Sequence, residues 1–126
     1  MVRMIYCVMR KEGVSVKAFR DYFVSTHKDK ICAVARQLKA KKFSQSLALM
    51  VEEGFMLMAR RGTAPPYDGI NEIWWDSARD FSKQVNAIEI EQVLEQFFSG
   101  EEEFIDLHRS RLFFTEHPQD CPESEL

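Results

Sequence analysis

The sequence predicts one α+β domain in which four strands form an antiparallel sheet with helices on one face. Apolar segments of strand length and helical stripes follow one another in the order strand, helix, strand, strand, helix, strand. The chain has 126 residues, which is room for one domain. Its 45% hydrophobic and 29% charged residues are typical of an ordinary globular protein.

The first strand is predicted at residues 4–10, an almost wholly apolar segment that ends at the turn sequence Lys11-Glu12-Gly13. We expect Ser15 to cap the helix that follows, because serine side chains accept hydrogen bonds from the first turn of a helix. Apolar positions then recur at steps of three and four residues as far as Leu38, with a break expected near His27. The stripe consists of Val16, Phe19, Phe23, His27, Ile31, Val34, Ala35 and Leu38.

The second strand is predicted between Phe43 and Leu49, where apolar and polar residues alternate. Residues 51–66 follow with the least regular pattern in the chain, because glycines and Pro65-Pro66 surround an apolar segment at residues 55–58. We expect this segment to form a short extra hairpin on its own surface. A lid or an interface is the alternative, because so long a loop is uncommon in a compact domain.

The third strand is predicted from Gly69 to Trp75, and Asp76 or Ser77 is expected to cap the next helix. Its stripe is Ala78, Phe81, Val85 and Ile88, and after Glu89 it restarts as Ile90, Val93, Leu94 and Phe97. Gly100 stands where a helix would end. We expect Glu101 to Glu103 to form a solvated acidic turn and Leu112 to Thr115 to form the last strand.

This order of elements is the βαββαβ pattern of a ferredoxin-like fold. Right-handed crossovers would place both predicted helices on one face of the sheet. We assign residues 1–117 to a single domain and residues 118–126 to a polar C-terminal tail.

Several predicted strands are apolar on both faces, and this predicts a homodimer. The first strand has Met4 and Tyr6 on one face and Ile5 and Cys7 on the other, and the third strand places one tryptophan on each face. Helices cover one face only, so the other would leave an exposed apolar patch. A second copy that packs sheet on sheet is the expected cover, and the 51–66 segment folding back is the alternative.

Composition excludes several classes of function. The net charge is −3, so no strong positive field favours nucleic acid or an anionic membrane. No apolar stretch is long enough to span a membrane. An odd number of cysteines without CxxC spacing indicates reduced thiols and a cytoplasmic location. We expect no metal and no nucleotide cofactor, because the histidines are scattered and glycine-rich phosphate motifs are absent from the sequence.

His27 is the candidate catalytic residue. It lies on the helix stripe with Phe19 and Phe23, so its imidazole is expected to point towards the sheet. Histidine exchanges protons near neutral pH, and an apolar environment favours its neutral, basic form. A structural histidine bonded to neighbouring backbone is the alternative. The residues expected to line a hydrophobic substrate site beside it are Phe23, Phe43, Asn71, Ile73 and Trp75.

Three segments of the sequence together resemble the EthD domain family. The first is the opening apolar strand with the turn Lys11-Glu12-Gly13, followed by Ser15, Phe19-Arg20-Asp21-Tyr22-Phe23 and His27. The second is Tyr67-Asp68-Gly69-Ile70-Asn71-Glu72-Ile73-Trp74-Trp75-Asp76-Ser77, and the third is Glu103-Phe104-Ile105-Asp106 with Ser110 and Phe114-Thr115-Glu116. They occur in the family's order over residues 4–117. The resemblance implies a dimeric α/β barrel and a role in the breakdown of ether, aromatic or polyketide-type molecules.

Three functional hypotheses follow. The first is a cofactor-independent enzyme of small-molecule catabolism, oxidoreductase-like or isomerase/lyase-like, in which His27 transfers a proton. The second is a non-catalytic binding module for a hydrophobic metabolite. The third is a structural accessory dimer in an oxidative degradation pathway, which would enclose no cavity.

Overall fold

A computed structural model describes residues 1–87 and 89–126, so the expected contribution of Ile88 to a helix stripe lies outside the described residues. Its centre is a four-stranded antiparallel sheet of order β2-β3-β1-β4. The strands are β1 (Val2–Val8), β2 (Lys42–Leu47), β3 (Gly69–Trp75) and β4 (Arg111–Glu116). The α+β, ferredoxin-like prediction is confirmed by this sheet and its helices.

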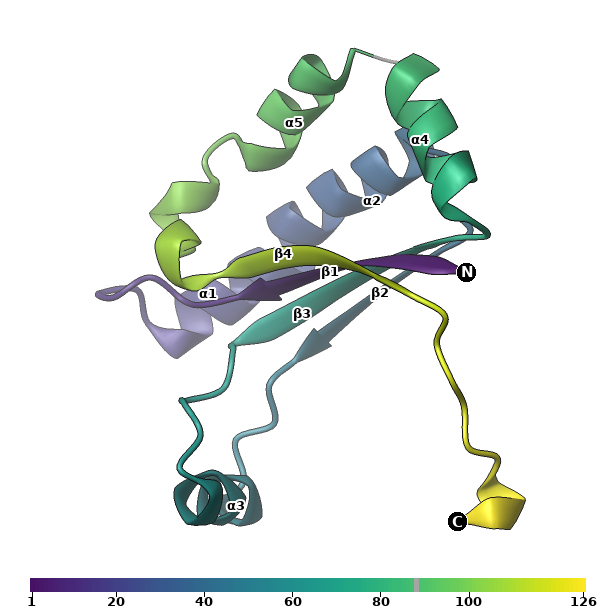
Figure 1. The fold of residues 1–126 in the computed structure, drawn as a ribbon. Coiled ribbons are helices and arrows are strands. Elements are labelled where there is room, and N and C mark those ends of the chain that lie inside the picture. Colours follow the sequence, from purple (N-terminus) through teal and green to yellow (C-terminus); the bar gives the residue numbers. More distant parts are fainter. Residues whose placement is uncertain (88) are drawn as a thin grey trace.

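One face of the sheet carries four of the α-helices (Figure 1). They are α1 (Val16–Tyr22), α2 (Lys28–Gln37), α4 (Ala78–Ala87) and α5 (Ile90–Phe98). A π-helical segment, η1 (Phe23–His27), joins α1 to α2. Short 3-10 turns occur at Glu101–Glu103 (η2), Leu107–Arg109 (η3) and Glu123–Glu125 (η4).

Two predicted helix caps are present. The Ser15 side chain accepts a hydrogen bond from the Ala18 backbone N–H at 3.0 Å, and Ser77 Oγ accepts one from Asp80 N–H at 3.1 Å. Each bond satisfies a donor that the first turn of a helix leaves without an intrahelical partner.

The helix-facing side of the sheet forms the core. Strand pairing aligns Met4 with Ile73 and Phe114, and Tyr6 with Asn71 and Leu112, so these residues share one face. Trp75 is buried at the end of β3, and its Nε1–H donates to the Leu38 carbonyl at 2.9 Å. These buried apolar side chains pack between the sheet and the helices, and His27 lies among them.

The opposite side, here called the outer face, is not covered by the helices (Figure 1). Because side chains alternate along each strand, a group of apolar residues lies on the outer face: Ile5, Cys7, Ile70, Trp74 and Phe113. Phe113 is 44% exposed and Ile70 is 36% exposed. Polar residues border the group: Arg3 pairs with Glu72 at 3.7 Å, and Lys42 Nζ lies 4.7 Å from the centre of the Trp74 ring.

The hairpin expected within residues 51–66 is wrong, because the structure has a helix there, α3 (Glu52–Arg61). Its first turn is acidic and its last turn basic, which suits the helix dipole, and Gly62 ends it in the left-handed conformation with φ 66°. Gly54 lowers the helical propensity but does not prevent the helix. Figure 1 shows α3 away from the sheet, on the side opposite the other α-helices.

Within the described part of the chain, no helix is both long and apolar enough to cross a membrane. Residues 118–126 are exposed and follow the last strand as an extended segment with η4 near its end.

Candidate active site

The helical segment between β1 and β2 changes its geometry where it approaches the sheet. The predicted break near His27 is confirmed, because residues Phe23–His27 are π-helical rather than α-helical. An inserted π-turn shifts the following side chains around the helix axis, and such turns often occur at functional sites. Here the turn ends at His27, which is 1% exposed and stacks on Phe23 with ring centres 5.0 Å apart.

The His27 ring is held by a hydrogen-bonded chain of amide side chains. Gln45 Nε2–H donates to Asn71 Oδ1 at 3.2 Å and to the Phe23 carbonyl at 2.9 Å. Because its oxygen accepts from Gln45, Asn71 presents its Nδ2–H to His27 Nε2, at 3.0 Å. Nε2 is then the acceptor, and the ring proton of neutral His27 is assigned to Nδ1.

The electrostatic environment keeps His27 neutral at physiological pH. Burial, with a smaller contribution from the Lys30 ammonium, lowers the pKa of His27 to about 4. An imidazole with this pKa is unprotonated at pH 7, which leaves it available as a base.

A buried acid lies one side chain away from His27. Tyr6, whose ring centre is 6.1 Å from that of His27, donates its O–H to Glu101 Oε1. Glu101 is fully buried, and burial together with the Glu102 carboxylate raises its pKa to about 8. At pH 7 Glu101 is therefore mainly a neutral carboxylic acid, and its second oxygen, Oε2, has no hydrogen-bond partner among the described residues.

The expected solvated acidic turn at Glu101–Glu103 is wrong for Glu101. Gly100 has φ 73°, a conformation that L side chains rarely adopt, and after this turn the Glu101 side chain is buried against Tyr6 of β1. Glu102 and Glu103 are exposed, as expected. The sequence does not show which of the three consecutive glutamates is buried, because the direction of each side chain depends on the backbone turn at Gly100.

Tyr22 connects this cluster to a surface pocket. Its ring centre lies 5.6 Å from that of His27, and its ring stacks on Phe104 with centres 4.1 Å apart. The Tyr22 hydroxyl is buried without a hydrogen-bond partner in the described structure, and burial raises its pKa to about 12, helped by Glu102 and Glu103. The hydroxyl is therefore protonated at pH 7.

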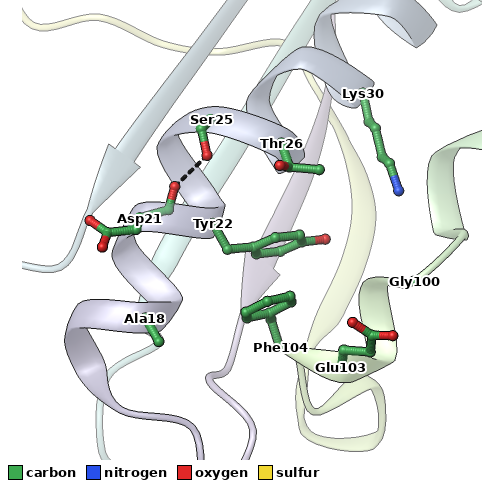
Figure 2. Close-up of a pocket in the computed structure, with 9 residues that line it drawn as sticks. All are labelled: Ala18, Asp21, Tyr22, Ser25, Thr26, Lys30, Gly100, Glu103 and Phe104. Atoms are coloured by element: carbon green, nitrogen blue, oxygen red, sulfur yellow. Dashed lines mark hydrogen bonds between the residues drawn. The ribbon is translucent and has the colours of Figure 1, made fainter.

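The pocket beside Tyr22 has a volume of about 370 Å3 (Figure 2). Tyr22 and Phe104 form an aromatic wall between the helical segment of residues 18–30 and the turn at Gly100. The remaining lining residues are Ala18, Asp21, Ser25, Thr26, Lys30 and Glu103. His27 is not one of them, so in this conformation the pocket ends at Tyr22.

The structure brings some of the sequence-predicted site residues to His27 and leaves others apart. Phe23 and Asn71 contact the ring directly. Phe43, Ile73 and Trp75 lie on the same face of the sheet but further along the strands, where Ile73 and Trp75 are buried core residues. The polar residues that sequence reasoning did not select are Tyr6, Tyr22, Gln45 and Glu101. The alternating pattern predicts a strand at Gln45, but its pairing with Asn71 requires the strand register.

The carboxylates of Asp68 and Glu72 each bind a different basic residue's backbone or side chain. Asp68 Oδ2 accepts a hydrogen bond from the Arg10 backbone N–H at 2.6 Å, and Glu72 pairs with Arg3 on the outer face. Among the described residues, no three His, Cys, Asp or Glu side chains are grouped as metal ligands.

Comparisons with known proteins agree with this architecture. The family model of the EthD domain matches residues 11–108. An ethyl tert-butyl ether D (EthD) family protein from Bacillus halodurans is 11% identical, with a TM-score of 0.60 over 94% of this chain and 99% of that one. An EthD-like protein from Ralstonia eutropha is 13% identical, with a TM-score of 0.59 over 91% of this chain and 89% of that one.

A protein from Arabidopsis thaliana is 12% identical, with a TM-score of 0.54 over 97% of this chain and all of that one. At these identities the structural likeness shows a shared fold. The comparison with curated proteins gives no match. The family match spans most of the chain and includes the residues around His27, and the chain therefore belongs to the EthD domain family.

Proposed function

We propose that this protein is a cofactor-independent enzyme that transfers a proton on a hydrophobic small molecule, with His27 as the base. One observation carries the proposal: a neutral, oriented histidine and a neutral buried carboxylic acid belong to one aromatic cluster. Environments that push two pKa values apart supply a base and an acid at the same pH. This combination favours isomerase- or lyase-like chemistry, and an oxidoreductase-like reaction that begins with proton abstraction uses the same groups.

Each group has a defined part in the proposed reaction. His27 Nε2 accepts a proton from substrate carbon or oxygen, and the substrate takes the place of the Asn71 amide at that nitrogen. Asn71 and Gln45 are positioning residues, because they hold the ring in one orientation and one tautomer until the substrate binds. Glu101 holds a proton that it can return to the substrate, and Tyr6 orients that carboxylic acid.

The substrate reaches His27 through the pocket beside Tyr22. Since His27 is almost fully buried, Tyr22 and Phe104 have to move apart for a molecule to pass. The aromatic wall and the neutral groups behind it suit an uncharged aromatic or ether-type compound. Two carboxylates, Asp21 and Glu103, line the pocket against one ammonium, Lys30, and this excess negative charge disfavours an anion. Membership of the EthD family supports a role in the breakdown of such compounds.

We place the protein in solution as a homodimer that packs outer face on outer face. The apolar group on that face, with its polar border, has the composition of a protein interface. The three unpaired thiols, Cys7, Cys32 and Cys121, support the expected cytoplasmic location.

Deuterium exchange tests the proposed proton transfer without knowledge of the natural substrate. The probe is 2-tetralone, an uncharged aromatic ketone with acidic hydrogens next to its carbonyl, followed by proton NMR in D2O. The protein should accelerate exchange at that carbon, and His27→Gln should abolish the acceleration while leaving the fold intact. His108→Gln, at an exposed histidine, is the matched control. Equal exchange with wild type and His27→Gln would rule out His27 as the base.

A non-catalytic binding role is the second candidate, favoured by the 1% exposure of His27. A binding module would be stabilised by a hydrophobic ligand whether or not the histidine is present. Thermal unfolding with 2-tetralone therefore separates the two roles. Stabilisation that persists in His27→Gln, together with no proton exchange in either protein, would favour binding over catalysis.

A further inference from the structure

The helix α3 and the residues that lead into it form an apolar segment that its own chain covers only in part, where Met50 and Phe55 line a pocket with Met9 and Arg109. All residues of α3 are described, and none of them is buried. We call residues 49–61 the arm. Its exposed large apolar side chains are Leu49, Met50, Val51, Phe55, Met56 and Leu57. Apolar side chains gathered in this way mark an interaction site, whereas single exposed ones do not.

A helix of this length needs a partner to be stable. The ten residues of α3 fall below the length of about 12–15 residues at which isolated helices become even marginally stable in water. Gly54 reduces its propensity further, and no side chain caps its N-terminus. Packing against another surface is therefore the expected source of its stability.

The base of the arm is fixed, so the position of the arm is defined. Ala48 N–H donates to the Asp68 carbonyl at 3.0 Å, and Arg20 Nη2 donates to the Ala48 carbonyl at 2.7 Å. On the returning side, Asp68 N–H donates to the Val8 carbonyl at 2.8 Å, and Pro65-Pro66 restricts the backbone before it. Figure 1 shows the result: the arm stands off the sheet on the side of the outer face.

A second copy of the chain can cover both the arm and the outer face. Each copy has one arm and one outer face on the same side of its sheet, so a two-fold axis can set each arm against the partner's face and close the assembly. The charges also match. The arm begins with Glu52 and Glu53 and ends with Arg60 and Arg61, whereas the outer face carries three basic residues, Arg3, Lys42 and Arg111, and one acidic residue, Glu72. The acidic start of the arm is therefore complementary to the excess positive charge of the outer face.

We propose that the arm, residues 49–61, packs against the outer face of a second copy of this chain and closes the homodimer. This inference rests on the proposed homodimer and adds a second, separate contact to it. In the free monomer the arm would be exposed and its helix would open.

Two measurements on the full-length protein test the inference. The first is the dimer dissociation constant from sedimentation velocity, compared between wild type and the double variant Met56→Ser with Leu57→Ser. Four apolar side chains per dimer lose their cover, so we expect dissociation to become easier by at least about tenfold. Leu94→Ser, at a leucine on α5 that is 40% exposed, should leave the dissociation constant within about twofold of wild type.

The second measurement is hydrogen exchange of the backbone amides of α3 as a function of protein concentration. We expect protection in the dimer that disappears on dilution below the dissociation constant. Protection independent of concentration would show that the arm folds back on its own chain and would overturn the inference.

The outcomes separate the arm from the homodimer. A dimer whose dissociation constant is unchanged by the double arm variant would overturn the arm and leave the homodimer standing. A protein that remains monomeric at all concentrations would overturn both.

Discussion

The Nδ2 atom of Asn71 lies 3.0 Å from Nε2 of His27, and both side chains are buried between the sheet and the π-helical segment. This contact joins β3 to the helical layer and fixes the orientation of the imidazole. Because an amide carries no charge, it holds the ring without raising its pKa, so His27 stays neutral at physiological pH.

Replacing that amide by a carboxylate should change the protonation of His27. In Asn71→Asp an opposite charge next to the imidazole favours its protonated form, so the pKa of His27 should rise from about 4 towards or above its ordinary 6.5. NMR titration of the ring resonances measures this change. The exposed Asn86→Asp is the control and should leave the His27 titration unchanged. An unaltered pKa in Asn71→Asp would contradict the contact between the two side chains.

The buried histidine should make the protein less stable in acid. The pKa of His27 is about 4 in the folded protein and returns to its ordinary 6.5 in the unfolded chain, so the unfolded state binds the proton more readily. The stability from neutral His27 is present above pH 6.5 and is lost as pH falls to 4. The difference corresponds to about 3 kcal/mol in the free energy of unfolding.

Urea unfolding across this pH range measures the effect. His27→Gln should remove the part of the pH dependence that belongs to this group, whereas His108→Gln should retain it. The same acid dependence in His27→Gln and wild type would contradict a depressed pKa.

Glu101 should produce the opposite pH dependence. Its pKa is raised from 4.5 to about 8 in the folded protein, so the folded state holds the proton that the unfolded chain has released. The stability from protonated Glu101 is complete below pH 4.5 and is lost as pH rises to 8. The whole change is on the order of 5 kcal/mol, and the part above pH 6.5 is free of the His27 effect.

The variant Glu101→Gln keeps a neutral side chain of the same shape. It should flatten the decline of the unfolding free energy between pH 6.5 and 8, as measured by urea titration. Glu95→Gln changes an exposed glutamate on α5 and should keep the wild-type profile. A decline of equal slope in Glu101→Gln would show that another group is responsible.

Gly69 leaves the space that the Phe23 ring occupies. A Cβ atom at this position would come within 2.5 Å of Cζ of Phe23, the ring that stacks on His27. We expect Gly69→Ala to lower the free energy of unfolding by about 1–3 kcal/mol, because the ring has to move. Gly54→Ala, in the exposed helix α3, should instead raise it by about 0.5–1 kcal/mol. Chemical denaturation compares the two, and a neutral Gly69→Ala would contradict the close approach.

The outer face should control the oligomeric state. Phe113 on β4 is 44% exposed. In a two-fold dimer, Phe113→Asp would introduce two negative charges into the proposed interface, one from each subunit. We expect the dimer to become at least about a hundredfold weaker in sedimentation velocity. Leu94→Asp on the helical layer is the matched control. Retention of the wild-type dimer in Phe113→Asp would place the interface elsewhere.

Much of the fold could be predicted from local pattern alone. Alternation separated the two faces of each strand, for example Tyr6 from Ile5 and Trp74 from Trp75, because side chains of a strand alternate whatever the tertiary context. Helical periodicity placed His27 on the inward stripe and located the break beside it, because a change of helical pitch disturbs the spacing of apolar residues. Local capping chemistry likewise predicted Ser15 as a cap and Ser77 as one of two candidates, with Asp76 as the other.

Only the tertiary structure decided how the polar groups meet. The bond from Asn71 to His27 depends on strand register and on the π-turn, and the burial of Glu101 depends on the backbone turn at Gly100. Side chains 95 positions apart, such as Tyr6 and Glu101, come together through packing that no short sequence pattern encodes. The arm illustrates the same limit, since Gly54 and the prolines that follow the arm are typical of a loop, while the charges and apolar spacing of the arm suit a helix. Sequence therefore determined the sheet, its faces and the candidate base, and packing determined the acid, the tautomer and the uncovered arm.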